Sequence, residues 1–200
     1  TKVWHDLIAR IPINLENGSR IIVTSRKKEV GLSIAETSYL LELSSLSPGD
    51  SWELFSKTVI SSGVSMEFKD IGEEIVKRCG GVPLAIVVAA GLLFGKNTKS
   101  EWIAVRERIG QEGDKCQKIL ALSYKDLPIE LKPCFLYFGA FPEDYEISAF
   151  SLINMWVAEG FVKARGRQEL EDVGEYYLSN LIARNLVQVV RRRCDGSIKI

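Results

Sequence analysis

The hydrophobic pattern of this chain changes once, near residue 47. Before that point, apolar residues at helical spacing (3–11) are followed by two short apolar runs at 20–25 and 39–43. Short apolar runs of this kind are typical of strands buried in a parallel sheet. After it, apolar residues recur at the spacing of helices. This order predicts the trailing half of an α/β sheet followed by helical domains.

Turn and cap signals divide the helical part. Ser47 is expected to cap a helix that has Pro48 at its first position, and Gly80-Gly81 is expected to end the next one. Pro83 then begins an apolar helix to residue 94, which is too short for the roughly 20 residues of a membrane span. Four helices between 47 and 113 predict a small bundle.

The last part predicts a winged helix. Four amphipathic helices between 114 and 183 are followed by two strand-like runs, 186–190 and 197–200, around the turn Asp195-Gly196. The aromatic residues Phe135, Phe138 and Phe141 are expected in its core rather than on a stacking surface. Helices followed by a β-ribbon are the pattern of a winged helix.

Composition excludes several classes of protein. The 200 residues carry 26 basic and 26 acidic side chains, which argues against a nucleic-acid coat or a polybasic membrane anchor. A hydrophobic content of 46% is enough for a sizeable core. The four cysteines lack the spacing of a metal site, and they indicate a reducing compartment. The single histidine leaves only one candidate base for a serine triad.

Several segments, in order, resemble one known family. The run 18–26 resembles the sensor motif of plant nucleotide-binding, leucine-rich-repeat immune receptors, and 43–55 resembles their next motif. Residues 79–86 resemble their GLPL motif, with Val82 where leucine is usual. Residues 134–145 are similar to the late motif of the coiled-coil subclass, and 156–161 and 184–186 continue the likeness. The motifs cover nearly the whole chain.

This resemblance implies a partial NB-ARC module. Residues 1–46 would be the C-terminal part of a nucleotide-binding α/β domain of the phosphate-loop type, 47–113 the helical ARC1 bundle and 114–200 a truncated winged-helix ARC2 domain, so the whole is mostly α. The phosphate loop and the magnesium-binding acids are expected before Thr1, and the Met-His-Asp motif beyond Ile200. We therefore expect this piece to bind ADP or ATP poorly by itself.

The resemblance also implies roles for six residues. Thr24-Ser25-Arg26 stands where the family has Thr-Thr-Arg, whose arginine contacts the terminal phosphate. By position alone, the favoured interpretation of Arg26 is a solvated cation beside two lysines. With the resemblance we favour the phosphate contact, which a guanidinium can make as a fork. Pro83 and Leu84 would pack on the adenine ring, and Gly81 would let the backbone approach closely. The same glycines and proline also have a purely structural explanation as helix breaks.

The chain is thus predicted to be a fragment of an ADP/ATP-dependent switch in a plant intracellular receptor. The predicted location is the cytoplasm, with the nucleus as a second compartment. Its partners would be nucleotide, the receptor's own coiled-coil and leucine-rich-repeat domains, and other copies on activation, with no membrane span. A regulated ATPase, at most slow and only in the full receptor, and a scaffold with a dead nucleotide site remain alternatives. DNA binding is disfavoured, because 148–160 and 169–183 contain no Lys or Arg to meet phosphates.

Overall fold

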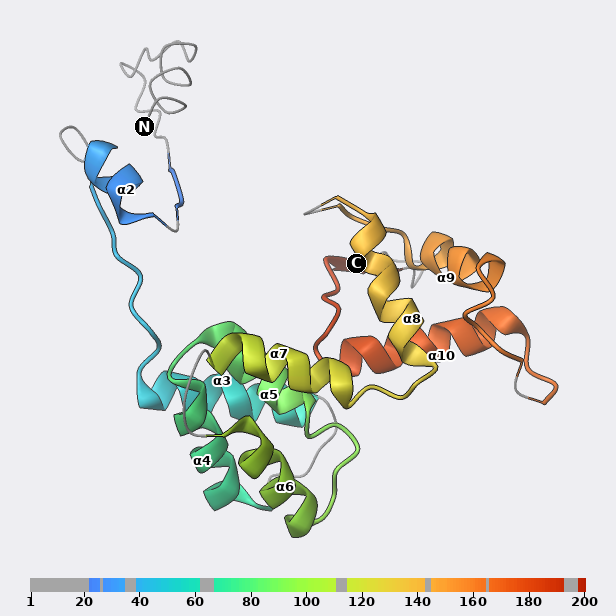
Figure 1. Ribbon diagram of the computed structural model, residues 1–200, viewed down its shortest axis with the longest axis horizontal. Coiled ribbons are helices and arrows are strands. Elements are labelled where there is room, and N and C mark those ends of the chain that lie inside the picture. The colour runs from blue at the N-terminus through green and yellow to red at the C-terminus, as the bar shows by residue number, and fades with distance from the viewer. Residues whose placement is uncertain are drawn as a thin grey trace, which may run out of the picture. The chain divides into compact units, whose positions relative to one another are not determined.

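Two compact units, Thr1–Ser44 and Ser45–Ile200, divide the chain. The computed structural model describes residues 22–25, 27–34, 39–61, 67–110, 115–142, 145–164, 166–192 and 198–200, shown as coloured ribbon in Figure 1. The predicted helix at 3–11 lies outside these residues. The described part is mostly helical, as the sequence predicts.

The described part of the first unit contains one short helix, α2 (Lys28–Ile34), which the sequence analysis did not predict. Lys28 Nζ pairs with Glu42 Oε1 at 2.5 Å, with both side chains exposed. Gly31 faces the Leu40 side chain so closely that a Cβ at this glycine would lie 2.6 Å from Leu40 Cδ1. These contacts hold the segment after the helix against α2.

The prediction of buried strands at 20–25 and 39–43 is wrong for the described residues of both runs. Residues 22–25 and 39–43 are irregular, and Ile22, Tyr39 and Leu43 are among the most exposed large apolar side chains described. A strand forms only when a neighbouring strand pairs with its backbone groups. No described segment pairs with either run, so their β-branched and apolar residues stay without a sheet.

Five helices of the second unit share the first core, which we define as the buried apolar cluster from Phe55 to Ile119. They are α3 (Pro48–Ser61), α4 (Lys69–Cys79), α5 (Pro83–Gly91), α6 (Lys99–Ile109) and α7 (Lys115–Lys125). Helix α5 packs against both α3 and α7, and α4 packs against α6 (Figure 1). The apolar run that begins at Pro83 is therefore a buried core helix, as predicted, although it ends at Gly91 rather than at residue 94.

The second core is the buried apolar cluster from Leu127 to Ile200. Its helices are α8 (Leu131–Leu136), the 3₁₀ turn η2 (Tyr137–Ala140), α9 (Ala149–Ala158) and α10 (Leu170–Ala183). The antiparallel strands β1 (Arg191–Arg192) and β2 (Ile198–Lys199) follow α10. The rings of Phe138 and Trp156 meet edge to face at 6.2 Å, and Trp156 is fully buried. The predicted role of Phe135, Phe138 and Phe141 as core residues is confirmed.

The predicted β-ribbon is present, and its second strand, β2, falls within the predicted run 197–200, but its first strand begins later than predicted. The predicted turn Asp195-Gly196 lies outside the described residues. Strand β1 begins at Arg191, not at residue 186, because the chain first closes the end of α10: the Leu186 N–H donates to Leu181 O at 3.0 Å, and Val187 is buried in the second core. The ribbon also gains an unpredicted partner. Ile147 and Ile200 exchange two backbone hydrogen bonds, of 2.8 and 3.0 Å, which ties the segment before α9 to the end of the ribbon.

Three cysteines of the described part, Cys79, Cys116 and Cys134, are free thiols. Cys79 donates to Ile75 O within α4, and both Cys79 and Cys134 are fully buried. Burial raises the pKa of Cys134 to about 12, so this thiol stays protonated and unreactive at neutral pH. Cys79 and Cys134 therefore behave as small core residues.

Candidate functional site

The turn between α4 and α5 is built from two glycines in left-handed conformation. Gly80, with φ 64°, closes α4 by donating its N–H to Lys77 O at 3.3 Å, and Gly81 follows with φ 73°. Residues with a Cβ rarely adopt these angles. Val82 is then extended and Pro83 begins α5. The predicted helix break and helix start are confirmed.

Gly81 is also a point of close backbone approach. The Leu46 N–H donates to Gly81 O at 2.9 Å. A Cβ at Gly81 would lie 2.6 Å from Leu46 O and 2.9 Å from the Ser45 Cβ. The chain that enters α3 therefore lies directly on the twin-glycine turn, and only glycine allows this contact.

The start of α3 is fixed by its own cap. Ser47 Oγ accepts the Asp50 N–H at 3.1 Å and donates to the Asp50 carboxylate at 2.6 Å, while Ser47 O accepts the Ser51 N–H at 2.9 Å. Pro48 occupies the first helical position, where its missing N–H costs nothing. The predicted capping serine and first-turn proline are both confirmed.

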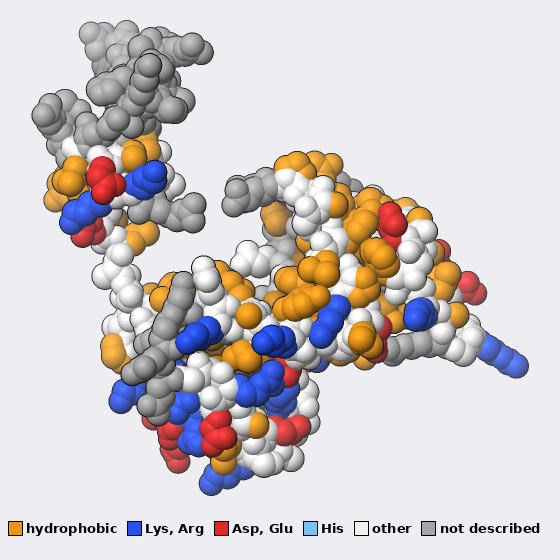
Figure 2. All heavy atoms as spheres, viewed as in Figure 1, with side chains coloured by type: hydrophobic (Ala, Val, Ile, Leu, Met, Phe, Trp, Pro, Cys, Tyr) orange, Lys and Arg blue, Asp and Glu red, His pale blue; other side chains and the backbone are white. Residues whose placement is uncertain are grey.

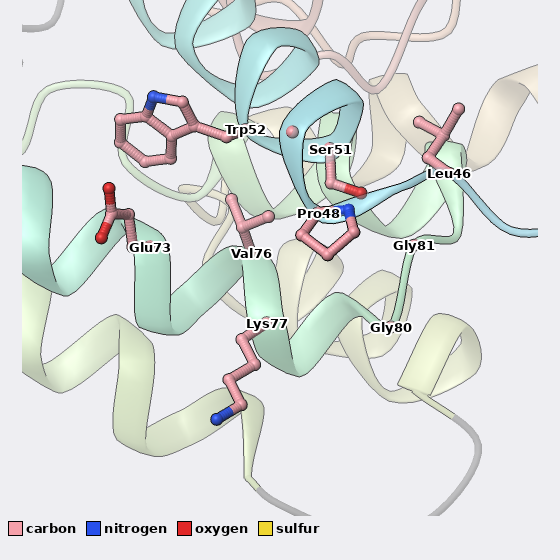
Figure 3. Close-up of a pocket in the computed structure, with 10 residues that line it drawn as sticks. Leu46, Pro48, Ser51, Trp52, Glu73, Val76, Lys77, Gly80 and Gly81 are labelled. Atoms are coloured by element: carbon pink, nitrogen blue, oxygen red, sulfur yellow. The ribbon is translucent and has the colours of Figure 1, made fainter.

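A hollow of about 660 Å³ lies between the first turns of α3 and the end of α4 (Figure 3). It is lined by Leu46, Pro48, Gly49, Ser51, Trp52, Glu73, Val76, Lys77, Gly80 and Gly81. Most of this lining is apolar. The Ser51 Oγ is buried and has no hydrogen-bond partner among the described residues. The Lys77 side chain extends away from Ser51 and Pro48 (Figure 3).

Pro83 lines a second, more open hollow of about 370 Å³ together with Leu46, Asp50, Glu53, Leu54 and Lys57. Leu46 lines both hollows, so it adjoins the hollow of Gly81 as well as that of Pro83. Leu84 is exposed at the start of α5. A flat ligand with an apolar face could contact Leu46 and the rigid ring of Pro83 with little loss of side-chain entropy.

The predicted site residues divide between the two units. Gly81, Pro83 and Leu84 lie together in the second unit, as described above. Thr24 and Ser25 belong to the first unit and are exposed, and Ser25 Oγ accepts the Lys27 N–H at 3.1 Å. Arg26 lies outside the described residues. Its phosphate contact and its meeting with Pro83 at one cavity remain predictions.

Sequence reasoning missed two parts of this site. Leu46 was not recognised as the residue that joins both hollows, and Trp52 and Val76 were placed only on apolar helix faces. The signal that could have found Leu46 is the twin glycine itself, since two successive glycines indicate that another backbone comes close.

The described residues contain no group of three His, Cys, Asp or Glu side chains that could hold a metal ion. None of their helices is both long and apolar enough to cross a bilayer.

Comparison with known proteins identifies the class. Residues 1–65 match the NB-ARC domain, and residues 140–200 match the disease resistance protein winged helix domain. The chain is 46% identical over 209 residues to the "ToMV resistant protein Tm-2 netted virescent" of Solanum lycopersicum and 44% identical to its "ToMV susceptible protein tm-2". It is 41% identical over 201 residues to a putative late blight resistance protein homolog of Solanum demissum.

These matches show that the chain belongs to the NBS-LRR family of plant disease resistance proteins and carries part of its NB-ARC and winged-helix regions. Each of the three relatives matches 98% of the chain. The chain spans 24% of the length of the two tomato relatives and 16% of that of the late blight relative. A resistance protein and a susceptible protein are almost equally similar to it, so similarity in this segment does not by itself indicate resistance.

The Gly81–Leu46 contact leads to a prediction on stability. Gly81→Ala should destabilise the second unit by about 2–4 kcal/mol, because it combines a left-handed residue with a clash against backbone. Gly95→Ala is the matched control: Gly95 has φ 74° and open space around it, so only the conformational cost of about 1–2 kcal/mol remains. Urea denaturation of the two variants measures the difference. Equal losses would contradict the packing of residues 45 and 46 on this turn.

Proposed function

We propose that this chain is part of an ADP/ATP-dependent molecular switch of a plant intracellular immune receptor that acts in the defence response. One observation carries the proposal: the twin-glycine turn packs on Leu46 and leaves an apolar hollow on one side and exposed Pro83 on the other. A purine has flat apolar faces that suit such a surface. Membership of a family that carries the NB-ARC domain, which implies nucleotide binding in general, supports a nucleotide as the ligand.

Within this proposal each predicted site residue has a role. Pro83 and Leu84 contact the purine, and Gly81 holds the backbone close to it. Arg26, presented by the Thr24-Ser25 segment, contacts the terminal phosphate with a forked, charge-assisted hydrogen bond. The phosphate loop and the acids that hold Mg²⁺ come from parts of the receptor outside this chain.

The switch would work by a shift of population between an ADP-bound form and an ATP-bound form of the receptor. We propose three parts: residues 1–46 of the nucleotide-binding domain, the ARC1 bundle 47–113 and the winged-helix ARC2 domain 114–200, although α7, at the start of the third part, packs in the first core. Moving the equilibrium from 1:99 to 99:1 takes about 5.5 kcal/mol of differential binding. One hydrogen bond to a charged group supplies about 1.5–3 kcal/mol. Arg26 therefore acts together with packing between domains.

The properties of the complete protein follow as proposals. Its coiled-coil and leucine-rich-repeat domains are the internal partners, activated copies associate with one another, and ATP hydrolysis, if used for resetting, is slow. The proposed location is the cytoplasm, with the nucleus as a second compartment. A scaffold that no longer binds nucleotide is the competing function.

Nucleotide content distinguishes the switch from the scaffold. We expect the complete protein to retain ADP on purification, measured as moles of ADP per mole of protein by mass spectrometry after denaturation. Pro83→Ala should lower the retained ADP about five- to tenfold, because the rigid apolar contact with the purine is lost. Pro142→Ala is the matched control, since Pro142 is an exposed proline outside both hollows. Absence of ADP from the wild-type protein would favour the scaffold.

The role of Arg26 has its own test in the complete protein. Arg26→Ala should weaken ATP binding about tenfold and leave ADP binding nearly unchanged, because only ATP offers the terminal phosphate. Lys28→Ala removes a nearby exposed cation that pairs with Glu42 and serves as the control. Equilibrium titration with both nucleotides gives the ratio. Equal weakening of ADP and ATP would remove the sensor role.

A further inference from the structure

The Asp126 carboxylate lies at the covalent connection between the first core and the second core. Upstream, Ile119 of α7 is buried in the first core, and one residue downstream Leu127 is buried in the second. The Asp126 side chain is only 16% exposed. A buried charge at such a point needs partners of opposite charge.

Three cations surround this carboxylate. Arg108 Nη1 donates to Asp126 Oδ1 at 2.6 Å, and Lys96 Nζ donates to Oδ2 at 3.0 Å. Arg184 Nη1 lies 3.9 Å from Oδ2 and completes the group as an ion pair. Lys96 and Arg184 are themselves mostly buried, with side chains 20% and 15% exposed.

The three cations come from both cores. Arg108 lies in the last turn of α6 and Lys96 in the loop after α5, and both elements belong to the first core. Arg184 directly follows α10 of the second core. Its guanidinium also lies over the ring of Phe94, 5.4 Å from the centroid, in the loop after α5. Arg184 is thus a residue of the second core that docks on groups of the first.

Backbone contact supports the same junction. A Cβ built at Gly91, the last residue of α5, would overlap the carbonyl oxygen of Arg184. The end of α10 therefore lies directly on the end of α5. This close approach brings Arg184 within reach of Asp126. In the space-filling view, Lys and Arg side chains also gather along the surface of the helical bundle (Figure 2).

The charges of this cluster depend on one another. An aspartate just after a helix faces the negative end of the helix dipole, so Asp126 does not stabilise α7 by its position. Burial acts to raise the pKa of Asp126, but hydrogen bonds and charge from Arg108 and Lys96 outweigh burial and hold it below its usual value. The carboxylate is therefore ionised at neutral pH. Removal of the Asp126 negative charge would leave three neighbouring cations without a counter-charge, which is strongly unfavourable in a buried setting.

We propose that Asp126 and Arg184 form an electrostatic latch that holds the second core against the first, with the pivot at residues 126–128. Release of this latch lets the second core turn about the connection after α7. The described connection between the cores is the one at Asp126. Only the use of the latch in switching rests on the proposed nucleotide function.

The latch is tested by the distance between the cores in the complete protein. Spin-labelled non-canonical residues at Ala104 of α6 and Ser151 of α9, both exposed, report that distance by double electron–electron resonance. We expect one narrow distribution for the otherwise unchanged protein. Asp126→Asn and Arg184→Gln should each add a longer distance, with the separated fraction rising at least about tenfold, which corresponds to a loss of about 1.4 kcal/mol.

Arg108→Gln is the matched control, because it removes a hydrogen bond to the same carboxylate from within the first core. It should keep the narrow distribution. The double variant Asp126→Asn/Arg184→Gln should separate no more than the stronger single variant, since both changes break one contact. Near-UV circular dichroism verifies that both cores stay packed in each variant. If Asp126→Asn does not fold, Arg184→Gln alone still tests whether the contact holds the cores together.

Two results would overturn the latch: an unchanged distribution in Arg184→Gln, or equal opening in Arg108→Gln. Measurement with and without ADP separates this inference from the proposed function. The distance reports the latch whether or not nucleotide binds, and nucleotide retention reports the proposed function whether or not the cores separate.

Discussion

The backbone contact between Leu46 and Gly81 determines the local architecture of the proposed site. Through this hydrogen bond of 2.9 Å, the chain that enters α3 is held on the turn that joins α4 to α5. Leu46 lines both hollows, and Pro83 is exposed at the first position of α5, directly after the extended Val82. A side chain at Gly81 would move Leu46 and change both hollows together. The site therefore depends on the absence of a side chain more than on any functional group.

Local signals predicted the helical part well. Ser47 with Pro48, the twin glycine, and the periodic apolar residues of α4, α6, α9 and α10 each depend on neighbours within one or two turns, and the structure follows them. The strands were predicted poorly because a strand depends on a distant partner that its own residues do not specify. Residues 22–25 and 39–43 have the right composition and no described partner, whereas Ile147 has a partner in Ile200 that composition did not reveal. The site followed the same division: Gly81 and Pro83 were predicted, and Leu46 was not.

The second unit has two cores joined by a short connection, and a cluster of mostly buried charges lies at that junction. Such a placement is costly for stability alone, since a buried charge group is often no better than apolar packing. It gives the junction a different property, because Arg184 of the second core reaches Asp126 only where the two cores are in contact. A junction of this kind suits a protein with two discrete arrangements. The larger hollow and the charged junction lie on the same helical bundle, so α4, α5 and α6 connect the proposed ligand site to the proposed pivot.

The central claim is that a purine nucleotide binds where Leu46 meets the twin-glycine turn. Photoaffinity labelling of the complete protein with 8-azido-ADP, followed by tryptic mapping, tests this directly. We predict that the label is competed by unlabelled ADP and falls in the peptides 29–57 and 79–96, which contain Leu46 and Pro83. Competed labelling confined to peptides of the second core, or no competed labelling of either predicted peptide, would contradict the account.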